Sequence, residues 1–76
     1  MAELLAWIVR QLVDDPTAVL VETVERDDAV VFRLHVAPED VGKVIGRNGR
    51  LARTLRTIVR AGGARSHSRM LLEIAE

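Results

Sequence analysis

Two glycines with basic residues around them form the part of this sequence best suited to bind an anion. Gly46 and Gly49 bracket Arg47 and Asn48, and a glycine at each corner allows a sharp turn and the close approach of a ligand. The N–H groups that begin a helix after such a turn lack an intrahelical acceptor and carry partial positive charge. Three basic side chains lie in or beside this turn: Lys43, Arg47 and Arg50. We therefore expect the turn to bind a phosphate group.

The charges of the chain are segregated along the sequence. Its 11 Lys and Arg residues balance 11 Asp and Glu residues, so the net charge is zero. Residues 1–40 carry three arginines and nine acidic residues, a net charge of −6, whereas residues 41–76 carry eight basic and two acidic residues, a net charge of +6. Between Val41 and Arg69 the sequence has no acidic residue. This asymmetry favours a one-sided anion-binding surface, although the two halves could instead neutralise each other across the fold.

The segment after the turn, Arg50–Ala61, has the period of an amphipathic helix. Its apolar face is formed by Leu51, Leu55 and Ile58, and Val59 lies at the margin of this face. The other side carries a row of arginines: Arg50 at its boundary, then Arg53, Arg56 and Arg60. We expect Arg50 and Arg53 to contact phosphate, whereas the other two are open between nucleic acid, a protein partner and solvent. Gly62 and Gly63 are expected to end this helix.

The remaining elements are also predicted from hydrophobic periodicity. A helix is expected over Ala2–Val13, and a hairpin of two strands over Ala18–Arg26 and Ala29–Val36. A short helix over Glu39–Ile45 precedes the glycine turn, and Arg69–Glu76 forms the last strand. The order helix, strand, strand, helix, helix, strand indicates an α+β fold.

The first helix carries one aromatic residue outside its apolar stripe. That stripe is formed by Leu4, Leu5, Ile8, Val9 and Leu12. Trp7 lies off it, so its ring either folds back over neighbouring side chains or contacts another chain.

The glycine turn, preceded by Val44-Ile45 and flanked by two helical segments, resembles the Gly-x-x-Gly signature of the KH domain. The whole chain is similar to the small bacterial single-KH proteins of the KhpA group. The matching segments are Leu12–Pro16, Val36–Arg50, Ala52-Arg53, Leu55-Arg56 and Leu72–Ile74. The resemblance implies one type II KH domain over residues 1–76, with a three-stranded mixed sheet and helices packed on one face.

The resemblance also implies a function. A KH protein of this kind binds single-stranded RNA without catalysis, in a groove between the glycine loop and the edge of the last strand. Gly46, Arg47, Asn48 and Gly49 would form the clamp, and residues 64–68 the opposite wall. The groove floor would be formed by Val41, Val44 and Ile45. The family further implies an RNA chaperone or post-transcriptional regulator linked to cell elongation and division, which forms a homodimer or pairs with a larger KH protein of the Jag or KhpB type.

Other classes of function fit the sequence poorly. The chain has no cysteine, its two histidines lie on separate segments, and the glycine turn matches neither a nucleotide-hydrolysis nor a dinucleotide-binding motif. We therefore expect no enzyme activity, no cofactor and no metal. Since no apolar run approaches the roughly twenty residues of a membrane span, we also expect a cytoplasmic protein. The alternative kept open is a protein-interaction adaptor on the same scaffold.

Overall fold

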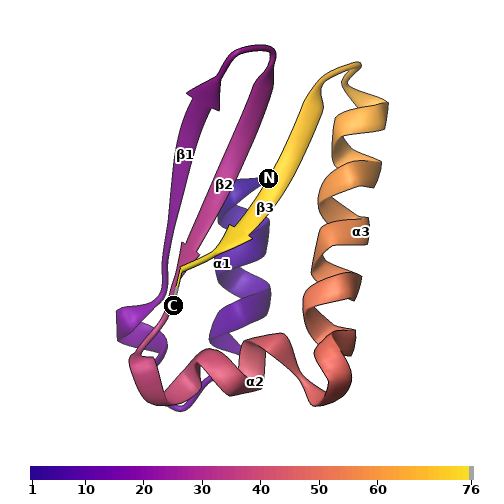
Figure 1. Cartoon of the computed structure of the whole chain (residues 1–76). Helices are drawn as coiled ribbons and strands as arrows, with labels where there is room; N and C mark the ends of the chain where they lie inside the picture. Colours follow the sequence, from indigo (N-terminus) through magenta and orange to yellow (C-terminus); the bar gives the residue numbers. More distant parts are fainter. Residues whose placement is uncertain (76) are drawn as a thin grey trace.

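The computed structural model describes residues 1–75 and contains the predicted order of elements (Figure 1). The helices and strands are α1 (Ala2–Arg10), β1 (Leu20–Arg26), β2 (Ala29–His35), α2 (Val41–Ile45), α3 (Arg50–Arg65) and β3 (Arg69–Ile74). Short 3₁₀ turns occupy Pro16–Ala18, Pro38–Asp40 and Arg47–Gly49. Glu76, which the sequence places at the end of the last strand, lies outside the described residues. No helix within residues 1–75 combines the length and the apolar character needed to cross a membrane.

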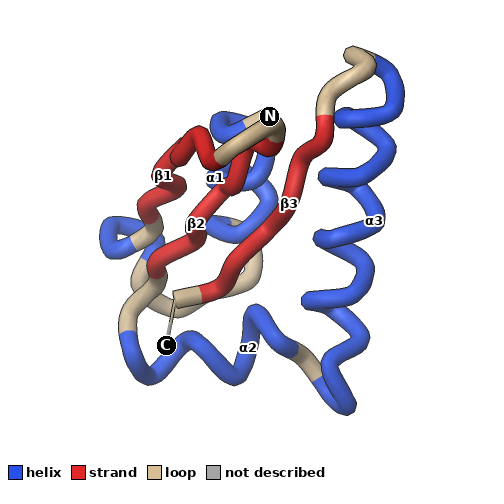
Figure 2. Tube along the Cα trace, turned by 45° about the horizontal axis from the view of Figure 1, so that its top comes forward, coloured by secondary structure: helices blue, strands red, loops and turns tan. Residues whose placement is uncertain are grey.

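The sheet is three-stranded and mixed, as predicted, with β2 in the middle (Figure 2). β1 pairs with β2 in antiparallel register, so that Thr23 lies opposite Phe32. β2 pairs with β3 in parallel register, and Phe32 there lies opposite Leu72. Because a parallel pair needs a crossover connection, α2, the glycine loop and α3 together carry the chain from the end of β2 back to the start of β3.

The core lies between one face of the sheet and the helices α1 and α3. Leu5 and Val9 of α1 and Leu55 and Val59 of α3 are almost completely buried there. The sheet contributes Phe32, Leu34 and Leu72. Figure 1 shows α1 behind the strands and α3 alongside β3. This arrangement leaves the outer edge of β3 next to α3.

The first helix is shorter than predicted. It ends at Arg10, and the N–H groups of Gln11 and Leu12 donate to Ile8 and Val9 three residues back, which tightens the chain into a turn. Leu4 and Leu12 are exposed instead of joining the apolar stripe, because the buried face is centred on Leu5, Ala6 and Val9. Trp7 lies off the core, as predicted, with 61% of its surface exposed.

The prediction that Gly62 and Gly63 end the third helix is wrong. α3 continues to Arg65, and Val59, predicted at the margin of its apolar face, is fully buried. The glycines are explained by packing instead. A Cβ on Gly63 would lie 2.5 Å from the carbonyl oxygen of Ser68, because β3 begins directly against this turn of α3. Residues 64 and 65, expected beyond the end of this helix, therefore belong to it.

The two glycines make a matched test of this packing. Gly63→Ala should lower the free energy of unfolding by about 1–3 kcal/mol, since backbone must move to admit the methyl group. Gly62→Ala should leave stability unchanged or raise it by up to about 1 kcal/mol, because alanine favours the helix. At this position the new Cβ meets only the end of the Met1 side chain. Urea unfolding of both variants decides the matter, and equal effects would contradict the packing explanation.

Candidate functional site

The glycine loop is a tight turn between α2 and α3. Gly46 has φ 76° and ψ 174°, and Gly49 has φ 73° and ψ 14°, values that glycine adopts without strain. The N–H of Gly49 donates to the carbonyl oxygen of Gly46 at 3.2 Å and closes the turn. A Cβ on Gly46 would lie 2.8 Å from the Cβ of Leu51, so a larger residue would push the loop off the start of α3. Asn48 takes the left-handed conformation, with φ 56°, which asparagine tolerates well.

The loop delivers the chain into the first turn of a 16-residue helix. No side chain of the described residues caps the N–H groups at this end of α3. The N–H of Arg50 donates to the carbonyl oxygen of Arg47 in the preceding 3₁₀ turn, and the N-terminal end of the helix carries partial positive charge. Arg47 and Asn48 are exposed at the tip of the loop, beside Arg50. These groups together form a cationic, donor-rich surface suited to a phosphate.

A row of arginines continues this surface along α3. All of them are exposed: Arg47, Arg50, Arg53, Arg56 and Arg60. In the part of the chain that the structure describes, none of these guanidinium groups forms an ion pair; the ion pairs there involve Arg33, His35 and Lys43. Unpaired positive charges along one helix face can all be directed to an external anion.

Two shallow hollows lie where α3 meets the outer edge of β3. One, of about 290 Å³, is lined by Arg56, Arg60, Met70, Leu71 and Leu72. A neighbouring hollow, of about 270 Å³, is lined by Arg60, Ser68, Arg69, Met70 and Leu71. The sequence left the roles of Arg56 and Arg60 open, and the family resemblance implied a groove at the edge of the last strand without naming the residues of that strand. Their association depends on the parallel pairing of β2 with β3, which local periodicity does not reveal.

The apolar residues predicted to floor the groove are not equivalent. Val44 is completely buried in the core and offers no exposed surface to a ligand. Val41 and Ile45 keep part of their surface exposed. Only these two of the three predicted positions are available to line a groove.

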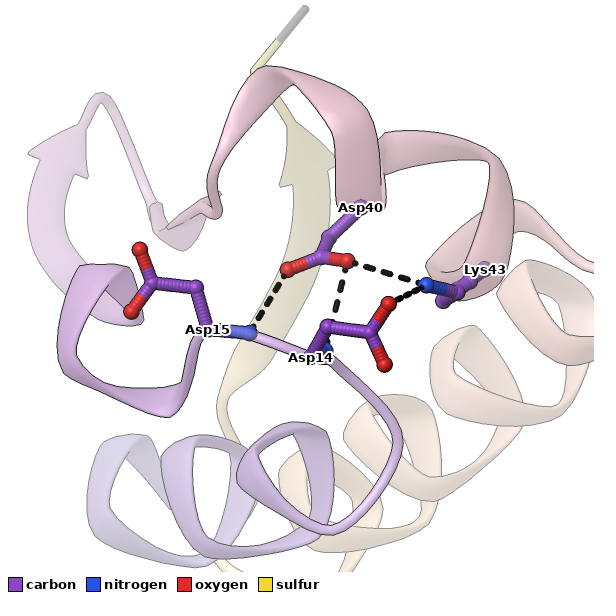
Figure 3. A network of polar contacts seen from close by, with 4 residues as sticks. All are labelled: Asp14, Asp15, Asp40 and Lys43. Carbon is purple, nitrogen blue, oxygen red and sulfur yellow. Dashed lines mark hydrogen bonds and ion pairs between the residues drawn. The ribbon is translucent and has the colours of Figure 1, made fainter.

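Lys43 is held by acidic side chains (Figure 3). Its Nζ donates to the carboxylate of Asp14 and, at 3.3 Å, to Oδ1 of Asp40. The Asp40 carboxylate has no exposed surface and also accepts the backbone N–H groups of Asp14 at 3.3 Å and Asp15 at 3.0 Å. This cluster ties the connection between α1 and β1 to the start of α2. The sequence missed it because Asp14 and Asp15 lie 25 to 29 positions before their partners Asp40 and Lys43.

The cluster shifts two pKa values. The pKa of the Asp40 carboxyl is below its usual value, mainly because the carboxylate accepts the N–H of Asp15. Burial raises this pKa, whereas the N–H of Asp14 and the Lys43 side chain lower it further. The hydrogen bond from Lys43 to Asp14 is the main cause that raises the pKa of the Lys43 ammonium group. Both groups are therefore held in their charged forms.

The histidines and acidic residues show no arrangement for metal binding. His35 is partly exposed and pairs with Glu22 across the two strands. Within residues 1–75 no three His, Cys, Asp or Glu side chains gather in a way that could hold a metal ion.

Comparisons with known proteins identify a matching family model and several relatives of similar length. A family model described as the KhpA/KhpB KH domain matches residues 2–74, a span that includes the glycine loop and β3. The protein named RNA-binding protein KhpA from Caldanaerobacter subterraneus is 43% identical over 74 residues, which cover 97% of this chain and 99% of that protein. The protein of the same name from Listeria monocytogenes is 42% identical over the full length of both chains. The one from Treponema pallidum is 47% identical over 97% of this chain and 92% of its own length.

The buried Asp40 carboxylate should make stability depend on acid. The pKa of this carboxyl is lower in the folded state than in the unfolded state, where it is about 4. The carboxylate therefore stabilises the fold above the unfolded pKa, and this stabilisation is lost as the pH falls through the folded-state pKa. The free energy of unfolding of the native protein should therefore fall more steeply from about pH 5 to pH 2 than that of Asp40→Asn. Urea unfolding at a series of pH values measures both curves. Parallel curves would contradict the role assigned to this carboxylate.

Proposed function

The chain belongs to the KhpA/KhpB family of KH domains, and we propose that it is a single KH domain that binds single-stranded RNA without catalysing a reaction. The observation that carries this proposal is the continuous cationic surface that begins at the glycine loop and follows α3 to the edge of β3. Relatives named as RNA-binding proteins support the choice of RNA as the polyanion.

The loop is the proposed clamp for the RNA backbone. A phosphate that approaches Gly46–Gly49 would meet the partial positive charge at the N-terminal end of α3 and no Cβ at the two glycine corners. Arg47 and Arg50 would neutralise its charge, and Asn48 would add a side-chain amide. Arg53, one turn further along, would contact the next phosphate.

The hollows between α3 and β3 are the proposed sites for the bases. Unstacked bases have apolar faces and polar edges, and these hollows combine apolar Met70 and Leu71 with the guanidinium groups of Arg56 and Arg60. Planar guanidinium groups can stack on bases as well as bind phosphate. We therefore assign Arg56 and Arg60, together with Val41 and Ile45, to the RNA groove.

A groove of this size accommodates about four nucleotides and specifies little sequence. Weak binding to many RNAs suits a chaperone or a post-transcriptional regulator better than a reader of one defined site. Such a protein gains affinity if two grooves act together, because the second contact is made at high effective concentration.

We propose a homodimer through the exposed side of α1 for this purpose. Trp7 and Leu20 line a hollow of about 430 Å³ between α1 and β1, and Leu4 is exposed nearby. Glu3 and Arg10 flank Trp7 on the same helix face, at i−4 and i+3. Two such helices packed antiparallel about a twofold axis near Trp7 would pair Glu3 of each copy with Arg10 of the other.

The clamp is tested by reversing the charge of its tip. Arg47→Asp combined with Asn48→Asp should lower affinity for a labelled single-stranded oligonucleotide by at least about 100-fold while the circular dichroism spectrum stays native, because two carboxylates would repel the phosphates. Arg26→Asp combined with Asp27→Asn, in the turn between β1 and β2, is the control and should bind as the native protein does. Native affinity in a folded loop variant would favour the alternative of a protein-interaction adaptor, whose docking would also depend little on salt.

The dimer is tested by exchanging the charges that flank Trp7. Glu3→Arg should weaken self-association about tenfold or more in sedimentation equilibrium, and the double variant Glu3→Arg with Arg10→Glu should restore it. Trp7→Ala should weaken it as well. A native protein that stays monomeric at micromolar concentration would refute the homodimer. Association only when a larger KH protein is added would assign the surface to a heterodimer.

A further inference from the structure

We infer that Lys43 positions the glycine loop from behind and does not contact RNA phosphate, an inference that rests on the proposed function of that loop. Lys43 belongs to the basic residues around the Gly-x-x-Gly turn, yet its ammonium group is bound to Asp14 and Asp40. The basic residues of the loop region would then divide into two groups. Arg47, Arg50 and Arg53 face solvent and bind the ligand, whereas Lys43 holds the element that carries them.

The buried charge of Asp40 is the reason that Lys43 cannot leave. Asp40 has no exposed surface, and Lys43 is the one cationic side chain that bonds to it within residues 1–75. The two N–H groups that Asp40 also accepts are neutral donors. If Lys43 turned to a phosphate, a carboxylate shielded from water would lose its counterion, which is far more costly than breaking an exposed pair.

The shortness of α2 explains why the ion pairs of Lys43 matter for the position of the loop. α2 has only five residues, too few to hold a helix by its own hydrogen bonds, and Gly46 follows it directly. Lys43 lies three residues before Gly46 and is bound to Asp14, which belongs to the connection after α1. Figure 3 shows Lys43 and Asp40 of this region turned toward that connection. The cluster therefore fixes α2, and with it the position of the loop, against the first part of the chain.

The slope of affinity with salt separates positioning from phosphate contact. Each phosphate contact to a single strand contributes about 0.7 to the slope of log K against log salt concentration. Arg50→Ala should reduce the slope by about this amount. Lys43→Met, which keeps the length and helix preference of the side chain, should lower affinity about three- to tenfold with the slope unchanged. A reduced slope for Lys43→Met, with native stability, would overturn the inference, and so would unchanged affinity.

Neutralising Asp14 should change RNA affinity in the direction opposite to the one that the loss of a negative charge alone would give. The Asp14 side chain is 80% exposed and that of Lys43 44% exposed, so Asp14→Asn removes a negative charge near the loop and one of the two bonds of Lys43. Long-range attraction alone would raise RNA affinity. We expect affinity to fall about two- to fivefold, because the loop loses part of its anchor.

Asp15→Asn is the matched control for Asp14→Asn. It makes the same charge change one residue away, but the Asp15 carboxylate points away from Lys43 in Figure 3 and accepts the hydroxyl of Thr17 at 2.6 Å. Its backbone N–H, which donates to Asp40, is retained. Asp15→Asn should bind RNA at least as tightly as the native protein. Equal or higher affinity for Asp14→Asn than for Asp15→Asn would refute the positioning role.

Amide hydrogen exchange tests, in the absence of RNA, whether Lys43 positions the glycine loop. Residues 46–50 should exchange about tenfold faster in Lys43→Met than in Arg50→Ala, since only the first change releases α2. If the native protein bound no RNA, the proposed function would fail, while this measurement would still decide whether Lys43 positions the loop. Should Lys43→Met not fold, the double variant with Asp40→Asn removes both charges of the buried pair and takes its place. Unchanged exchange in the variant that folds would overturn the inference.

Discussion

The parallel pairing of β2 with β3 decides where every other part of the site can lie. Parallel neighbours need a crossover, and here α2, the glycine loop and α3 supply it. α3, at 16 residues about 24 Å long, runs back beside β3, which is an edge strand. The start of α3 and its loop therefore lie at the end of the sheet where β2 stops, as Figure 1 shows. One helix face thus follows one strand edge from the loop onward.

Much of this architecture could be predicted because local patterns determine it. The alternation of Met70, Leu72 and Ile74 on one side of β3 holds in the structure, since a half-buried strand must separate its two faces. The arginines of α3 are exposed together because they share one face of a helix with a period of 3.6 residues. Gly46 and Gly49 bracket a sharp turn, as expected, and both have positive φ angles. These features depend on neighbours in sequence.

The structure differs from the sequence-based expectations, or adds contacts to them, where distant segments meet. Gly62 and Gly63 have the composition of a helix end, but the approach of Ser68 and Met70 makes Gly63 a packing requirement inside α3. Val44 has the period of a groove residue, but burial under α3 and the sheet places it in the core. Lys43, expected to contact a ligand, also forms an ion pair with Asp14, 29 residues earlier, which the sequence did not indicate. Each outcome depends on a tertiary contact for which the local pattern contains no signal.

A net charge of zero does not oppose RNA binding, because Asp14 and Asp40 are paired with Lys43 and four other acidic residues lie away from α3. Glu22, Glu25, Asp27 and Asp28 lie on β1 and the turn after it, at the opposite edge of the sheet from α3. Strands about 4.8 Å apart place β1 about 10 Å from β3, and α3 adds about another 10 Å. Since the Debye length at physiological salt is about 8 Å, these acidic residues would be largely screened from an RNA bound along α3. In the proposed complex the arginines would act at contact distance, so the local surface charge would govern binding.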